Sequence, residues 1–141
     1  MPVVSKVVEL EGYKLLDGGM TDSIPLAYFQ QIGFERNIVI LTQPIGYLKT
    51  PNRLMPLISA SLRRYPHVVE AMRHRPEMYN RQLAYLEQEE QKGNTLVIRP
   101  LEKLPIGHIS HDPEEMKRVY EIGREMGEQK IKEICDFLIK N

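Results

Sequence analysis

The segment Ile38 to Thr42 constrains the fold more than any other part of this sequence, because it is a continuous apolar run. Runs of this kind are typical of a strand that is buried on both faces of a parallel sheet. A second short strand is predicted at Leu96 to Ile98, and we expect it to pair beside or near the first. Helical patterns lie between the two. The sequence therefore predicts an α/β fold of three layers, with helices packed on a mostly parallel sheet.

The chain of 141 residues has the length of one domain, so residues 1–141 are expected to form a single unit. Its 19 basic residues balance its 19 acidic ones, and nucleic acid is therefore not expected as a partner. No apolar run is long enough to span a bilayer, and the first residues lack the pattern of a signal peptide. The single Cys135 excludes an internal disulfide. These features favour a cytoplasmic protein.

An acidic residue followed by two glycines stands at the end of a predicted strand. The strand covers Tyr13 to Leu16 and follows a hairpin-like turn at the pair Glu11-Gly12. Asp17 comes next, and Gly18 and Gly19 follow it. Glycine lets a ligand or the backbone approach closely, so we expect Asp17 to project onto an open turn. Taken alone, Asp-Gly-Gly is also typical of a purely structural turn.

Helical patterns occupy much of the remaining chain. Asp22 or Ser23 is expected to cap a short helix directly after the glycines. From Arg53 to Lys92 the apolar spacing is again helical, and Pro66 and Pro76 are expected to interrupt it. These helices are the ones expected to cover the sheet.

The last predicted helix begins with Asp112 as its capping residue. Its apolar positions recur with a period near 3.6 and follow one face. They are Met116, Val119, Tyr120, Gly123, Gly127, Ile131, Ile134 and Leu138. Two glycines four residues apart on this face indicate close packing against another element, not a membrane motif.

The loop after Ile38 to Thr42 supplies candidates for the rim of a site. Loops at the carboxyl ends of strands line the ligand crevices of open α/β sheets. Tyr47, Lys49 and Arg53 are therefore candidate rim residues. The alternative, a solvated connection without a binding role, is the more common structure at such positions.

Two further groups have weaker signals. Five arginines between residues 63 and 81 form a basic strip that could contact the phosphate headgroups of a membrane surface, although such strips are more often a solvated helix face. They are Arg63, Arg64, Arg73, Arg75 and Arg81. His108 and His111 have a spacing that metal sites use, but capping and surface roles are more common for a pair like this. We expect neither a metal nor a cofactor.

The N-terminal motif resembles that of bacterial patatin-like phospholipases. The resemblance rests on Gly12, Tyr13, Asp17, Gly18, Gly19, Asp22, Ile24 and Pro25, with Gly33 and the strand after it. It is strong from about Pro2 through that strand and looser to the last helix, where Tyr120 and Gly123 fit. The resemblance implies a three-layer patatin-like fold related to α/β-hydrolases. It also implies that Asp17 is the general base of a Ser-Asp dyad, with Gly18 and Gly19 in the active-site turn.

The serine that such a dyad needs is missing from this sequence. None of its serines stands in a G-x-S-x-G elbow. The resemblance thus implies the C-terminal half of a serine acyl hydrolase acting on lipid or carboxyl esters, which is inactive without the serine-bearing N-terminal half. The alternative is a non-catalytic α/β module for binding or assembly. In either case exposed sheet edges favour a homo-oligomer or association with the separate N-terminal half.

Overall fold

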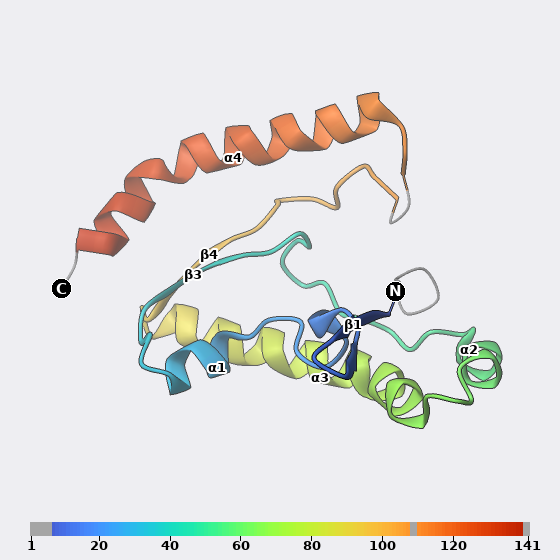
Figure 1. Ribbon diagram of the computed structural model, residues 1–141. Helices are drawn as coiled ribbons and strands as arrows, with labels where there is room; N and C mark the ends of the chain where they lie inside the picture. Colours follow the sequence, from blue (N-terminus) through green and yellow to red (C-terminus); the bar gives the residue numbers. More distant parts are fainter. Residues whose placement is uncertain (1–6, 108–109, 140–141) are drawn as a thin grey trace. The chain divides into compact units, whose positions relative to one another are not determined.

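In the computed structural model, which describes residues 7–107 and 110–139, the chain divides into two units (Figure 1). The first contains the described residues up to position 29 and residues 48–87, and the second contains residues 30–47 together with the described residues from 88 onward. Two helices cross the boundary between the units, α1 (Leu26–Gln31) and α3 (Pro66–Gln91). Each unit is described by itself below.

The first unit opens with an antiparallel hairpin. Strands β1 (Val8–Leu10) and β2 (Tyr13–Leu15) pair in a register that places Val8 opposite Leu15. The two residues between them, Glu11 and Gly12, have φ values of 51° and 81°. Positive φ at both positions is the conformation that two-residue hairpins prefer, because its twist matches that of the strands. The predicted hairpin is confirmed.

Helix α3 is the longest element of the first unit and continues past a proline. It runs over 26 residues with Pro76 inside it, so the predicted interruption at Pro76 is wrong. Pro66 is its first residue, a position where a missing N–H costs no hydrogen bond. One face carries buried Val69, Tyr79, Leu83 and Leu86 at helical spacing. We infer that burial of this face outweighs the one hydrogen bond that Pro76 cannot donate. The short helix α2 (Met55–Ser61) precedes α3.

The second unit contains the parallel pair that the sequence predicts. Strand β3 (Asn37–Ile40) pairs with β4 (Thr95–Ile98), with Asn37 opposite Thr95 and Ile40 opposite Ile98 (Figure 1). Pairing of these two segments is thus confirmed, and so is a mixed α/β class. Both sheets among the described residues have two strands. Nothing in them supports the three-layer patatin-like arrangement.

Burial of the two parallel strands differs from the expectation. Strand β4 is buried along its whole length, whereas β3 is half-buried and its last residue, Ile40, is 74% exposed. The prediction that Ile38 to Thr42 is buried on both faces is therefore wrong. Each of the two strands has one paired neighbour among the described residues, and the difference is that α4 packs against β4.

A buried carboxylate joins three segments of the second unit. Glu89, near the end of α3, is 4% exposed. Its oxygens accept hydrogen bonds from Gln30 Nε2 at 2.8 Å, Asn94 Nδ2 at 3.1 Å and Lys92 Nζ at 2.6 Å. The bond from Lys92, followed by those from Asn94 and Gln30, lowers the pKa of Glu89 to about 2. The carboxylate therefore stays ionised and ties the end of α3 to the turn before β4.

Helix α4 (Pro113–Ile139) completes the second unit. Asp112 caps it, since Asp112 Oδ1 accepts a hydrogen bond from Glu114 N at 3.0 Å, as the sequence predicts. Near its other end, the guanidinium of Arg36 lies 4.3 Å from the centre of the Phe137 ring and donates to the Phe137 carbonyl. Among the described residues, no helix combines the length and apolarity that crossing a membrane requires.

Candidate functional site

Asp17 lies on an exposed turn two residues after β2. It caps the 3-10 helix η1 (Gly18–Met20), because its Oδ1 accepts a hydrogen bond from Gly19 N at 2.9 Å. Met20 N donates to the Asp17 carbonyl at 3.1 Å, and the Met20 side chain is buried. The structure thus places Asp17 at the end of a strand, with its carboxylate engaged by the turn. Its role as a base stays a prediction.

The two glycines serve this turn in different ways. A Cβ atom on Gly19 would lie 3.2 Å from Asp17 Oδ1, so the absence of a side chain leaves room for the capping carboxylate. A Cβ on Gly18 would meet no atom within 4 Å. The Gly19 carbonyl accepts two hydrogen bonds, from Ser23 Oγ at 2.7 Å and from Arg75 Nε at 2.9 Å. The turn is therefore attached to α3 through the Arg75 guanidinium.

Gln82 attaches the next residues to α3. Its Oε1 accepts hydrogen bonds from Ser23 N at 3.2 Å and Ile24 N at 3.1 Å, and its Nε2 donates to Asp22 Oδ1 at 2.5 Å. These bonds change the expectation that Asp22 or Ser23 caps α1. The Ser23 hydroxyl bonds backward to Gly19, and the Asp22 carboxylate accepts from Gln82. Hydrogen bonds to Gly19 and Gln82 therefore take the place of the cap that the sequence predicts for α1.

Lys49 is the predicted rim residue that lies near this turn, close to Arg75. Its backbone is held on α3 by Asn80, which accepts from Lys49 N at 2.8 Å and donates to Lys49 O at 3.0 Å. Its Nζ lies 4.8 Å from the centre of the Tyr79 ring. Burial, followed by the nearby charge of Arg75, lowers the pKa of Lys49. Two half-buried cations therefore lie close together on one side of α3.

The other predicted rim residues are not part of this cluster. Arg53 is exposed before α2 and forms no ion pair with any residue that the structure describes. Tyr47 is half-buried and belongs to the second unit. Of the two candidate metal-binding histidines, His108 lies outside the described residues, and residues 7–107 and 110–139 contain no group of three metal-binding side chains.

Sequence reasoning missed the α3 residues that build the site. In the sequence, Arg75 belongs only to a basic strip, and no local pattern predicts the roles of Asn80 and Gln82. Arg75, Tyr79 and Gln82 follow one another at intervals of four and three residues, so they share one side of a helix. Two polar residues, Arg75 and Gln82, on the same side of the helix as the buried Tyr79 indicate that other parts of the chain contact this side of α3.

The cluster combines the two cations with the Asp17 carboxylate, because Asp17 Oδ1 and Arg75 Nη2 both lie within 4 Å of the position that a Cβ on Gly19 would take. Neither Lys49 nor Arg75 forms an ion pair with a carboxylate in the described part of the chain. No described hydroxyl donates to Asp17; the nearby Ser23 Oγ donates to Gly19. Arg75 uses Nε for the Gly19 carbonyl and keeps its terminal nitrogens as donors. The arrangement thus presents hydrogen-bond donors with positive charge to an incoming group.

Comparison with known proteins identifies a family that matches this chain. A family described as "Domain of unknown function (DUF6363)" matches residues 65–139, which is more than half of the chain and extends from the start of α3 to the end of α4. No curated protein and no solved structure matches. No patatin-like family is found, so the assignment to that family is wrong. The motif that suggested it forms a capped turn, a role for which Asp and Gly are common.

Proposed function

This chain belongs to the DUF6363 family, a domain of unknown function, and we propose that it is a non-catalytic binding module for a phosphate-bearing ligand. The ligand's phosphate is held by Lys49 and Arg75 beside the turn at Gly19. This develops the binding module that the sequence left as the alternative to a hydrolase. The hydrolase itself depended on the patatin-like resemblance, which the family match overturns.

One observation carries the proposal: Lys49 and Arg75 are both half-buried, lie close together and have no acidic partner among the described residues. Removing a charge from water costs free energy unless an opposite charge compensates. Here burial and mutual repulsion both disfavour the charged form of Lys49, which is why its pKa is lowered. A bound anion would offset both effects.

The positions of the two side chains favour an oxyanion in particular. The bond from Arg75 Nε to the Gly19 carbonyl orients the guanidinium, whose terminal nitrogens form a fork suited to two phosphate oxygens. Asn80 fixes the backbone of Lys49 on the same helix, so its ammonium supplies a second charge. Two cations match the charge of a phosphate monoester. A soluble phosphate ester and a lipid headgroup share this chemistry.

Titration calorimetry tests the proposal with inorganic phosphate and glycerol phosphate as soluble ligands. Co-sedimentation with phosphatidylcholine vesicles, with and without phosphatidic acid, tests the lipid source. Lys49→Gln and Arg75→Gln should each weaken binding about tenfold or more, which corresponds to about 1.4 kcal/mol. Binding to soluble esters would identify a soluble ligand, and binding to the acidic vesicles alone would identify a headgroup.

Arg53→Gln is the matched control, because it also removes one positive charge but from an exposed side chain without an ion pair to a described residue. It should bind as the wild type does. Equal weakening by Arg53→Gln would show general electrostatic attraction instead of a site, and no binding in either assay would refute the proposal. Affinity should also fall as the pH rises through the lowered pKa of Lys49, because the ammonium loses its proton.

A further inference from the structure

Helix α4 carries an apolar stripe that the described residues of its own unit leave uncovered. The stripe consists of Met116, Tyr120, Gly123, Gly127, Ile131, Ile134 and Leu138. Four of its seven members, Met116, Tyr120, Ile131 and Leu138, are each more than half exposed. A 27-residue helix gains most of its stability in a protein from packing of its apolar face. An uncovered stripe of this length therefore indicates a binding partner.

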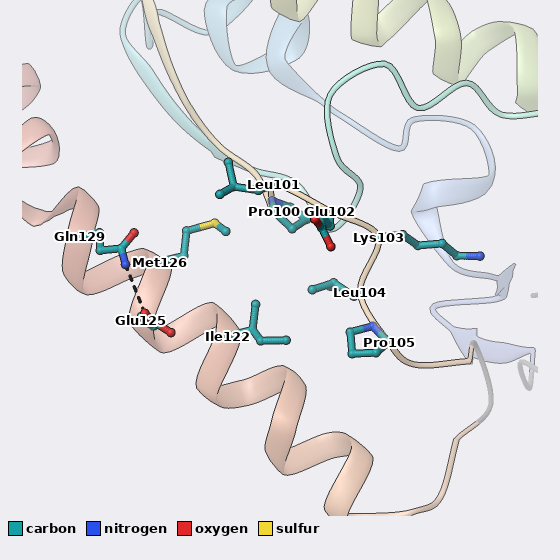
Figure 2. Close-up of a pocket in the computed structure, with 10 residues that line it drawn as sticks. All are labelled: Pro100, Leu101, Glu102, Lys103, Leu104, Pro105, Ile122, Glu125, Met126 and Gln129. Carbon is teal, nitrogen blue, oxygen red and sulfur yellow. Dashed lines mark hydrogen bonds between the residues drawn. The ribbon is translucent and has the colours of Figure 1, made fainter.

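A different side of α4 packs within its own unit. Ile122 and Met126 point toward the segment from Pro100 to Pro105, and with Gln129 and that segment they line a cavity of about 450 Å³ (Figure 2). Because these positions are turned around the helix from the stripe, the contact with the 100–105 segment leaves the stripe free. The stripe and the cavity are separate surfaces.

The two glycines of the stripe are not required for packing against any described residue of their own unit. A Cβ atom on Gly123 or on Gly127 would meet no atom within 4 Å. Each glycine nevertheless costs an exposed helix about 1 kcal/mol relative to alanine. Small residues on a helix surface allow a second helix to approach closely. The glycines therefore point to a partner helix that crosses α4 at this place.

The order of residues in the stripe identifies the partner as a second copy. Leu138 and Met116 are both eleven residues from Gly127, Ile134 and Tyr120 are both seven, and Ile131 and Gly123 are both four. In two antiparallel copies related by a two-fold axis at Gly127, these residues come level with each other. Ile131 then faces Gly123 of the other copy, while Leu138 meets Met116 and Ile134 meets Tyr120 farther from the axis.

The charges beside the glycines are compatible with this arrangement. Arg124 and Glu128 lie on the same flank of the stripe, and Arg124 bonds Glu128 within its own helix at 3.0 Å. A two-fold axis perpendicular to the helices places this flank of one copy against the same flank of the other copy. Arg124 of one copy is then level with position 130 of the other copy, which is two residues from Glu128. Opposite charges therefore alternate across the axis.

We propose that α4 pairs antiparallel with α4 of a second copy of this chain, with the two-fold axis at Gly127. Sedimentation equilibrium should give twice the chain mass of 16.4 kDa. Gly127→Leu should favour the isolated helix but place a bulky side chain at the axis, so it should give a monomer. Arg118→Leu adds the same side chain on the side of α4 away from the stripe and should leave the dimer intact.

Disulfide cross-linking tests the direction of the helices. In a Cys135→Ser background, Gly127→Cys should form a cross-linked dimer on oxidation, because the two positions meet at the axis. Gly123→Cys should not, because its two copies lie about 12 Å apart along an antiparallel pair, beyond the reach of a disulfide. A wild type that is monomeric at about 100 µM, a Gly127→Leu dimer, or efficient cross-linking through Gly123→Cys would each overturn the proposal.

Discussion

Replacing Gln82 by alanine is the sharpest test of how the Asp17 turn is held on α3. The change removes the acceptor for Ser23 N and Ile24 N and the donor to Asp22 Oδ1. Each lost hydrogen bond costs about 0.5–1.5 kcal/mol, and more where a buried N–H is left unpaired. Ile24 is 7% exposed, so its N–H is poorly placed to bond water instead. Alanine returns a few tenths of a kcal/mol through its helix propensity.

The net loss from Gln82→Ala is therefore expected to be about 2 kcal/mol in the free energy of unfolding. With a urea m-value of about 1–3 kcal/mol/M, the midpoint should fall by about 1 M. Helicity measured by circular dichroism during urea titration gives the midpoint. Gln88→Ala is the matched control, because Gln88 is an exposed glutamine on the same helix. Equal midpoints for the two variants would refute the reasoning about Gln82.

Two further predictions concern the carboxylates. Because the pKa of Glu89 is lowered from 4.5 to about 2, this group stabilises the folded chain fully above pH 4.5 and loses its effect as the pH falls toward 2. Urea midpoints of the wild type and Glu89→Gln should therefore converge between pH 5 and pH 2.5, and a constant difference would contradict the assignment. At Asp17, asparagine keeps an oxygen for Gly19 N whereas alanine does not. Asp17→Asn should match the wild-type urea midpoint, and Asp17→Ala should lower the free energy of unfolding by about 1 kcal/mol. Equal losses in the two variants would show that the hydrogen bond from Gly19 N to residue 17 does not stabilise the fold.

The sequence by itself determined the features that depend on neighbouring residues. The hairpin at Glu11 and Gly12 follows from residues that tolerate positive φ, and the start of α4 follows from Asp112 as a cap. The pairing of β3 with β4 was also predictable, since each is a short apolar strand and helices separate them. Local propensity and hydrophobic pattern suffice for such elements because the interacting groups are close in sequence or strongly patterned.

Only the tertiary structure decided which surfaces are covered and which side chains meet. An apolar run does not reveal what covers the faces of its strand, so the sequence predicts a buried β3 although β4 is the buried strand. The bonds from Arg75 to Gly19 and between Gln82 and Ser23 join residues 56 and 59 positions apart. Such contacts depend on where α3 packs, and this depends on burial of a face that runs through Pro76. The proposed site at Lys49 therefore depends on packing, because no local pattern brings its two cations together.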